Sequence, residues 1–151
     1  MNRAKIRNDM IDKDTNTIRL ALAVNNDGIF ENKHFGEAER FHIYEWNNDT
    51  FTFLNDEINP FKNADEEREH GVKEKGKGIS NFLKSLGTQV IVSKQFGKNL
   101  KIVSKYFIPV VVVNSNPEEI IPLLNNYIDW FFEELNGKTE NYKLLNLKHR
   151  V

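Results

Sequence analysis

The chain has 151 residues, which is enough for one domain with a self-sufficient core. It holds no cysteine, so disulfides, cysteine nucleophiles and thiolate ligands are excluded, and a metal would need His, Asp, Glu, amide or backbone ligands. The formal net charge of -1 favours neither nucleic acid nor an anionic membrane as a partner. Because no apolar segment approaches the roughly 20 residues of a membrane span or forms a signal peptide, we expect a cytoplasmic protein.

The amino-terminal half is predicted to form three strands. Residues 1–16 are polar and are predicted to be a flexible leader. The segment 18–24 alternates apolar with short or polar residues, which predicts a strand with one buried face, and turn residues follow it. The segments 41–46 and 50–54 also have strand character, and the three polar residues between them predict a hairpin.

Residues 59–77 lose the apolar periodicity of the preceding strands. They carry five basic and five acidic side chains, which predicts a long, mobile and solvated loop. Long loops of this kind also serve as binding lids. Because His70 lies inside the segment, it is a candidate second metal ligand on a movable element.

The remaining residues alternate between helix and strand. Apolar spacing predicts helices over 79–86 and 100–107, and short β-branched runs predict strands over 90–92 and 108–113. A third helix is predicted over 117–135, with a distortion at its internal proline. This order predicts an α/β domain of three α/β/α layers with a five-stranded mixed sheet over residues 17–137, followed by a C-terminal extension, 138–151.

One histidine, His34, lies in the connection between the first and second predicted strands. Ligands in open α/β sheets bind outside the carboxyl ends of strands, where this connection starts. A neutral imidazole can donate a lone pair to iron, copper, nickel or a molybdenum-containing cluster. His34 is therefore the best-placed candidate ligand, although it could instead only cap the turn that contains it.

These segments resemble the dinitrogenase iron-molybdenum cofactor biosynthesis family, which includes the NifX and NafY accessory proteins. The resemblance covers roughly residues 18–125. Its most specific element is His34-Phe35-Gly36 after the strand 20–24. Weaker matching elements are Asp27-Gly28, Asn59-Pro60, His70-Gly71, Leu83 to Gly87, Phe96-Gly97 and Pro117-Glu118-Glu119.

The resemblance implies a ribonuclease H-like sheet and a non-enzymatic protein that carries an iron-molybdenum or other metal-sulfur cluster between a donor and an acceptor protein. By position, the cluster ligand would be His34, and His70 in the charged loop is the candidate second metal ligand named above. We also assign cluster binding to Phe35, Gly36, Asn25 and Gly28, since glycine N–H groups can form a nest for an anion. Many relatives have a Gly-Gly turn before the second helix, where this chain has the bulkier segment 93–97.

Two other classes of function are alternatives to the carrier hypothesis. Nuclease chemistry needs carboxylates that converge on two metal ions about 3.5 to 4 Å apart, but no acid follows the strand 90–92. Residues 71–78 resemble the phosphate-binding loop GxxxxGK[ST]. They lack the Ser or Thr that would bind magnesium, which indicates a chance similarity.

The second class is a protein-interaction or regulatory module of the same fold that binds no cluster. Trp130, Phe131 and Phe132 crowd one helix, which suggests either a homodimer surface or cover by the C-terminal extension.

Overall fold

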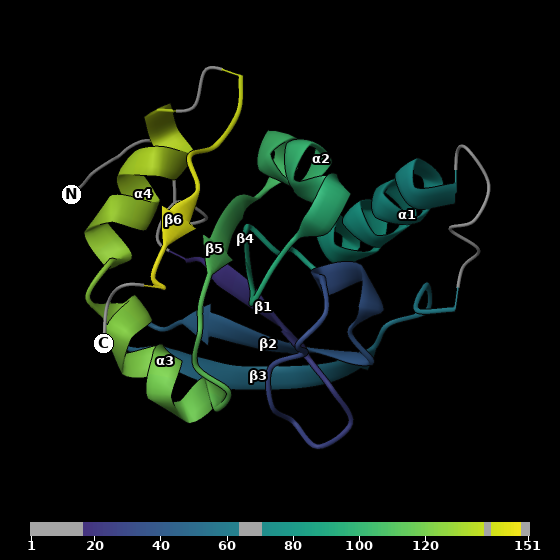
Figure 1. Ribbon diagram of the computed structural model, residues 1–151. Helices are drawn as coiled ribbons and strands as arrows, with labels where there is room; N and C mark the ends of the chain where they lie inside the picture. The colour runs from purple at the N-terminus through teal and green to yellow at the C-terminus, as the bar shows by residue number, and fades with distance from the viewer. Residues whose placement is uncertain (1–16, 64–70, 138–139, 149–151) are drawn as a thin grey trace.

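The sheet is built around β1 (Arg19–Val24), which pairs antiparallel with β2 (Arg40–Trp46) and parallel with β4 (Val90–Ser93). The computed structural model describes residues 17–63, 71–137 and 140–148. The strand order is β3-β2-β1-β4-β5-β6 (Figure 1). The predicted single buried face of β1 is wrong: both faces are buried, because helices cover both sides of this central strand.

The predicted hairpin of β2 and β3 (Phe51–Ile58) is confirmed, and β3 continues four residues beyond the predicted end. Asn48 has a positive φ of 79° in the turn between the strands, and the Asn47 side chain accepts hydrogen bonds from Asp49 N and Thr50 N. β3 is an edge strand, and its register shifts opposite Ile43 and Tyr44. The hairpin thus forms the antiparallel half of the mixed sheet.

The parallel half contains one strand more than predicted. β5 (Ile108–Val111) pairs parallel with β4, and β6 (Leu145–Asn146) pairs parallel with β5, which gives six strands among the described residues. β6 comes from the predicted C-terminal extension, and Leu147 behind it is fully buried. The extension therefore covers the aromatic residues of the last helix, where Phe131 is buried with its two aromatic neighbours partly buried beside it.

The first helix, α1 (Gly71–Ser85), begins inside the predicted charged loop, so that prediction is wrong for its last seven residues. The helix starts earlier because of tertiary contacts that the sequence pattern does not show. Lys75 occupies a buried position one turn before Ile79, where a helical pattern would have an apolar residue. Gly76 and Gly78, which weaken a helical prediction, lie where a Cβ atom would come 2.6 Å from the Asn99 side chain and the Phe61 ring, respectively.

The predicted third helix is two helices, α3 (Pro117–Asn125) and α4 (Ile128–Gly137). Asn116 caps α3 by accepting a hydrogen bond from Glu118 N, and Pro117 is its first residue, as the predicted start at residue 117 requires. The break follows Asn125 rather than Pro122. The Asn125 side chain accepts from Phe51 N at 2.9 Å and donates to Thr50 Oγ1 at 2.7 Å, so the end of α3 is bonded to the start of β3.

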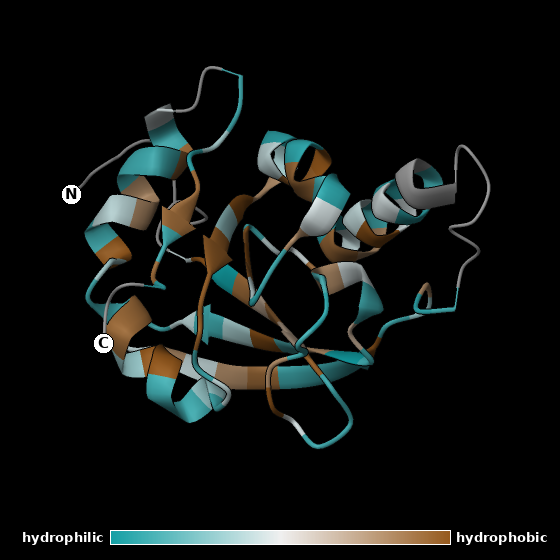
Figure 2. Ribbon diagram, in the orientation of Figure 1, coloured by the Kyte–Doolittle hydropathy of each residue, from teal (hydrophilic) through white to brown (hydrophobic). Residues whose placement is uncertain are grey.

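The two faces of the sheet carry separate cores. On one face, α3, α4 and the C-terminal segment pack on Leu20, Leu22 and their neighbours. On the other face, α1 and α2 (Leu100–Tyr106) pack on Ala21, Ala23 and Ile91. Apolar residues, brown in Figure 2, occur along the strands and in the helices on both sides of the sheet. The predicted three-layer α/β fold is confirmed, and no described helix is long and apolar enough to cross a membrane.

The glycine at position 76 should be essential for docking α1. Gly76→Ala should lower the free energy of unfolding by about 1 to 3 kcal/mol, although alanine is intrinsically the better helix former, because its Cβ would collide with the buried Asn99 amide. Gly137→Ala is the control, since a Cβ there meets nothing within 4 Å. Urea unfolding of both variants measures the difference; equal midpoints would contradict this packing.

Candidate functional site

Three loops meet where the parallel strands β1, β4 and β5 end. Phe35 N, in the loop after β1, donates to Gln95 O at 3.0 Å, and Gln95 Nε2 donates to Asn32 O at 2.8 Å. Phe30 N donates to Ser115 O in the loop after β5 at 2.9 Å. The predicted position of the His34 loop is therefore confirmed, and backbone hydrogen bonds hold it in place.

His34 lies at the start of a 3-10 turn, η2 (Phe35–Glu37), and caps it. Its Nδ1 accepts a hydrogen bond from Gly36 N at 3.2 Å. A Cβ atom on Gly36 would lie 3.1 Å from His34 Cε1, and one on Gly97, which has φ +62°, would lie 3.2 Å from His34 Cβ. Two glycines thus enclose the histidine side chain, which remains 25% exposed.

This hydrogen bond determines how the ring could bind a metal. Because Nδ1 accepts from a backbone N–H, the neutral imidazole carries its proton on Nε2. A metal ion needs a free lone pair, so ligation by His34 requires either displacement of Gly36 N from Nδ1 or movement of the proton from Nε2. The capping role, which was the alternative to ligation, is therefore present in the structure.

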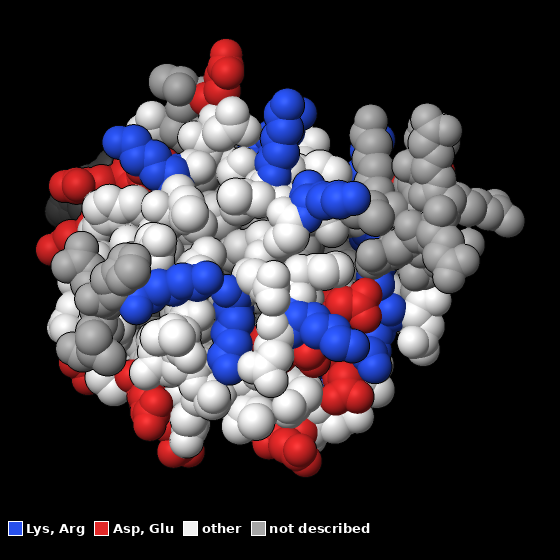
Figure 3. Space-filling model, in the orientation of Figure 1, with Lys and Arg blue, Asp and Glu red and all other residues white. Residues whose placement is uncertain are grey.

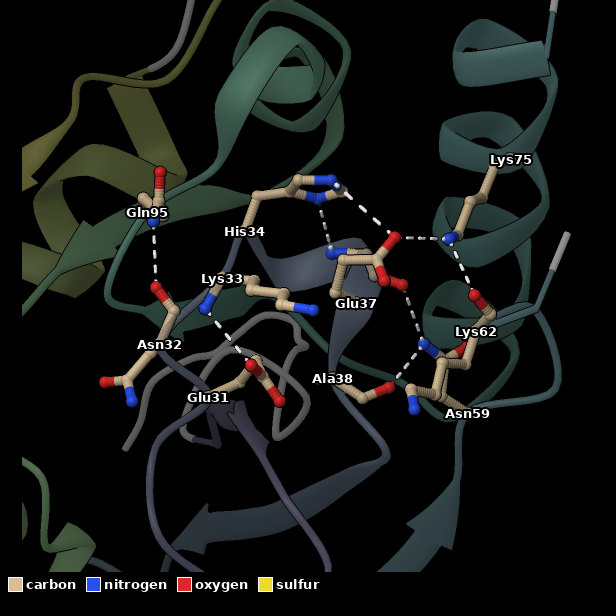
Figure 4. A network of polar contacts seen from close by, with 11 residues as sticks. Glu31, Asn32, Lys33, His34, Glu37, Ala38, Asn59, Lys62, Lys75 and Gln95 are labelled. Carbon is tan, nitrogen blue, oxygen red and sulfur yellow. Dashed lines mark hydrogen bonds and ion pairs between the residues drawn. The ribbon is translucent and has the colours of Figure 1, made fainter. Parts of the chain in front are cut away.

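Glu37 lies next to the histidine and is held there by a buried lysine (Figure 4). Lys75 Nζ, with the side chain 1% exposed, donates to Glu37 Oε2 at 2.9 Å and to Lys62 O at 2.8 Å. Burial alone would raise the pKa of Glu37, but the hydrogen bond and charge of Lys75, with the charges of His34 and Lys33, hold it below its ordinary value. A carboxylate therefore lies 3.9 Å from His34 Nε2 at neutral pH.

Asn59 makes the turn around His34 rigid. Its Nδ2 donates to Gly36 O at 3.2 Å and Ala38 O at 2.9 Å, and its Oδ1 accepts from Phe61 N at 2.9 Å. The side chain is buried, and its two donated bonds join segments that are distant in sequence, whereas the bond from Phe61 N closes a local turn. The sequence indicates Asn59 only as part of the family resemblance. It does not predict the ion pair of Glu37 with Lys75 or the contact of Gly97 with His34.

Of the other predicted cluster-binding residues, Gly36 lies against the His34 ring, whereas Phe35, Asn25 and Gly28 make their contacts elsewhere. Phe35 is fully buried, with its ring centroid 5.5 Å from that of Phe96. Asn25 and Gly28 close their own turn, in which Gly28 N donates to Asn25 O at 3.0 Å. The N–H groups of Gly28 and Gly36 thus already donate inside the loop, and the expected nest for an anion is not formed.

The predicted second ligand, His70, lies outside the described residues. Within residues 17–63, 71–137 and 140–148, no group of three or more His, Cys, Asp or Glu side chains could hold a metal ion. In the described part of the chain, His34 is thus a single candidate ligand with one neighbouring carboxylate.

His42 is a separate histidine on β2. Its Nε2 lies 3.4 Å from Asp56 Oδ1, and its ring packs edge-on against Phe53 with centroids 5.5 Å apart. Burial lowers the pKa of His42; the charge of Asp56 opposes this, and the charge of Arg40 adds to it. His42 therefore has its own partners on β3, Asp56 and Phe53, and it serves as a control for His34.

A family model described as "Dinitrogenase iron-molybdenum cofactor" matches residues 16–128. The chain belongs to the dinitrogenase iron-molybdenum cofactor family. No curated protein matches the chain significantly. Membership in the dinitrogenase iron-molybdenum cofactor family confirms the resemblance and supports an accessory role related to that cofactor in general. The match includes β1 to α3 and every residue of the His34 site, while most of α4 and all of β6 lie beyond it.

The face in Figure 3 carries both signs of charge. Basic side chains lie across its middle, and acidic ones lie mainly toward its lower and left edges. No single sign covers this view of the family member, in agreement with the formal net charge of -1. This face therefore lacks the uniformly basic surface that is typical of nucleic-acid-binding domains.

Lys75→Met should destabilise the protein by about 1 to 2 kcal/mol at pH 7, because it leaves Glu37 Oε2 and Lys62 O without their donor. A carboxylate with a lowered folded pKa contributes stability above its ordinary value of 4.5, and this contribution is lost as the pH falls through the folded pKa. The difference from wild type should therefore shrink in acid.

Unfolding curves at several pH values test this, with Lys77→Met, on the exposed side of α1, as the control. A difference that stays constant with pH would contradict the role given to the Glu37 carboxylate.

Proposed function

We propose that this protein binds an iron-molybdenum or other metal-sulfur cluster weakly through His34 and passes it from a donor to an acceptor protein. The single observation that supports this most is the partly exposed imidazole, held by a rigid loop at the carboxyl ends of the parallel strands. Family membership supports the kind of cargo. In this proposal the protein is a carrier and catalyses no reaction.

The hydrogen bond at Nδ1 makes the proposed attachment weak. Ligation at Nδ1 would displace Gly36 N, and a hydrogen bond of this kind contributes about 1 kcal/mol, or roughly a fivefold change in affinity. A carrier must release its cargo, so a ligand that competes with its own cap suits transfer better than storage. The alternative, ligation at Nε2, would place the cluster beside Glu37.

His70 remains a proposed second ligand. It precedes α1, the helix whose Lys75 holds Glu37 beside His34. Two imidazoles would bind a cluster more tightly than one. A His70→Ala variant, measured alone and combined with His34→Ala, separates a shared site from independent ones by the additivity of the two effects.

His34→Ala should weaken cluster uptake at least tenfold, because it removes the only candidate nitrogen ligand in the described part of the site. Anaerobic titration of the purified apo protein with a synthetic metal-sulfur cluster, followed by the cluster's absorption spectrum, measures uptake. His42→Ala is the matched control and should bind as wild type does. Equal uptake by the His34 variant would remove this residue from the site.

A second candidate function is a protein-interaction or regulatory module that binds no cluster, and the surface of β3 favours it. Phe53, Leu54 and Ile58 are 53%, 46% and 64% exposed on this edge strand. Exposed apolar edges can pair with another polypeptide. If wild-type protein takes up no cluster in the titration above, that result favours the interaction module over the cluster carrier.

A homodimer through the β3 edge is one form of this second function. Sedimentation equilibrium should then give twice the chain mass for wild type, and the mass of one chain for Phe53→Ser. Tyr106, which is 47% exposed on α2, offers the control Tyr106→Ser. A wild-type protein that sediments as one chain would exclude this homodimer.

A further inference from the structure

A cavity of about 230 Å³ lies at the opposite end of the parallel strands from His34. Thr17, Gln89 and Tyr106, which line it, each come shortly before a parallel strand, whereas His34 follows one. The other wall comes from α4 and the segment after it, through Phe132, Asn136 and Tyr142. The cavity and the His34 loop are therefore separate sites.

The second wall lies outside the family match, which ends at residue 128. Hydrogen bonds hold it against the rest of the domain. Tyr142 N donates to Ser104 O of α2 at 2.7 Å, and Lys143 N donates to Glu134 Oε2 of α4 at 2.8 Å. These bonds tie the chain after α4 to α2 and to α4, and this segment runs between the two helices in the upper part of Figure 1. The cavity thus depends on segments that the family model does not describe.

Gln89 presents a fixed hydrogen-bond donor to the cavity. Its Oε1 accepts from Arg19 N at 3.2 Å, and its backbone bonds both Arg19 O and Ile108 N. This arrangement orients the carboxamide and leaves Nε2 without a partner among the described residues. The Thr17 and Tyr106 hydroxyls and the Asn136 carboxamide likewise have no hydrogen-bond partner in the part of the chain that the structure describes.

None of the described residues that line the cavity carries a charge at neutral pH. Three of the side chains are aromatic, and burial, with the charge of Glu134, raises the pKa of the Tyr142 hydroxyl, so that it stays neutral. A phosphate or carboxylate would lose its hydration here without meeting a cation. A flat ring would gain contact with the aromatic side chains, while carboxamides and hydroxyls suit donors and acceptors on its edge.

We propose that this cavity binds a neutral heteroaromatic ring of nucleobase size, as a free base or a nucleoside. The volume is below the roughly 300 to 1,000 Å³ of pockets for drug-sized ligands, which suits one such ring and leaves its substituents in solvent. The proposal stands independently of cluster binding, since it involves neither His34 nor the loops around it.

Isothermal titration of the full chain with adenosine, uridine and their 5′-monophosphates tests the proposal, with glucose as a non-aromatic probe. At least one nucleoside should bind one to one, and its monophosphate at least tenfold more weakly. Asn136→Trp, which fills the mouth from an exposed position, and Gln89→Met, which removes the fixed donor, should each weaken binding at least tenfold. Asn81→Trp, exposed on α1, is the matched control.

Absence of nucleoside binding below about 1 mM, binding retained by Asn136→Trp, or preference for glucose would each overturn the proposal. A urea midpoint close to that of wild type shows that each variant is folded. His34→Ala should bind the nucleoside as wild type does, and Asn136→Trp should take up cluster as wild type does. Failure of one site is therefore distinguishable from failure of the other.

Discussion

The burial of β1 on both faces is the constraint on which the rest of the structure depends. Its backbone bonds β2 on one edge and β4 on the other, so the strand can neither shift register nor turn without breaking two ladders. The chain that leaves Val24 must then emerge beside the ends of β4 and β5. Hydrogen bonds from this loop to the loops after β4 and β5 then fix the position of His34.

The contacts that dock α1 also determine the surroundings of the histidine. Lys75 is buried against η2 and is compensated by Glu37 and by a backbone carbonyl, which is how a buried cation is tolerated. The next residue, Gly76, allows the Asn99 side chain to approach the helix, although Asn99 Oδ1 has no hydrogen-bond partner among the residues that the structure describes. Stability and electrostatics are therefore linked here, because the carboxylate that neutralises Lys75 is also the one beside the imidazole.

The two ends of the parallel strands differ in what supports them. At the carboxyl ends, the His34 site consists entirely of residues within the family match, and its polar groups are largely bonded to one another. At the amino ends, the cavity is walled by α4 and by the segment that continues into β6, beyond that match. This later segment extends the sheet, covers Phe131 and completes the cavity, so it adds both core and surface to the fold of the family.

Local patterns in the sequence were sufficient for the central strands, the hairpin, the start of α3 at Pro117 and the position of the His34 loop, because hydrophobic period and turn residues act over only a few neighbours. They did not reveal the start of α1, since Lys75 and two glycines replace the apolar pattern there. They also did not reveal β6, because a two-residue strand exists only through its pairing with β5. The contact between Glu37 and Lys75 joins residues 38 positions apart, so only the tertiary structure could place that ion pair beside His34.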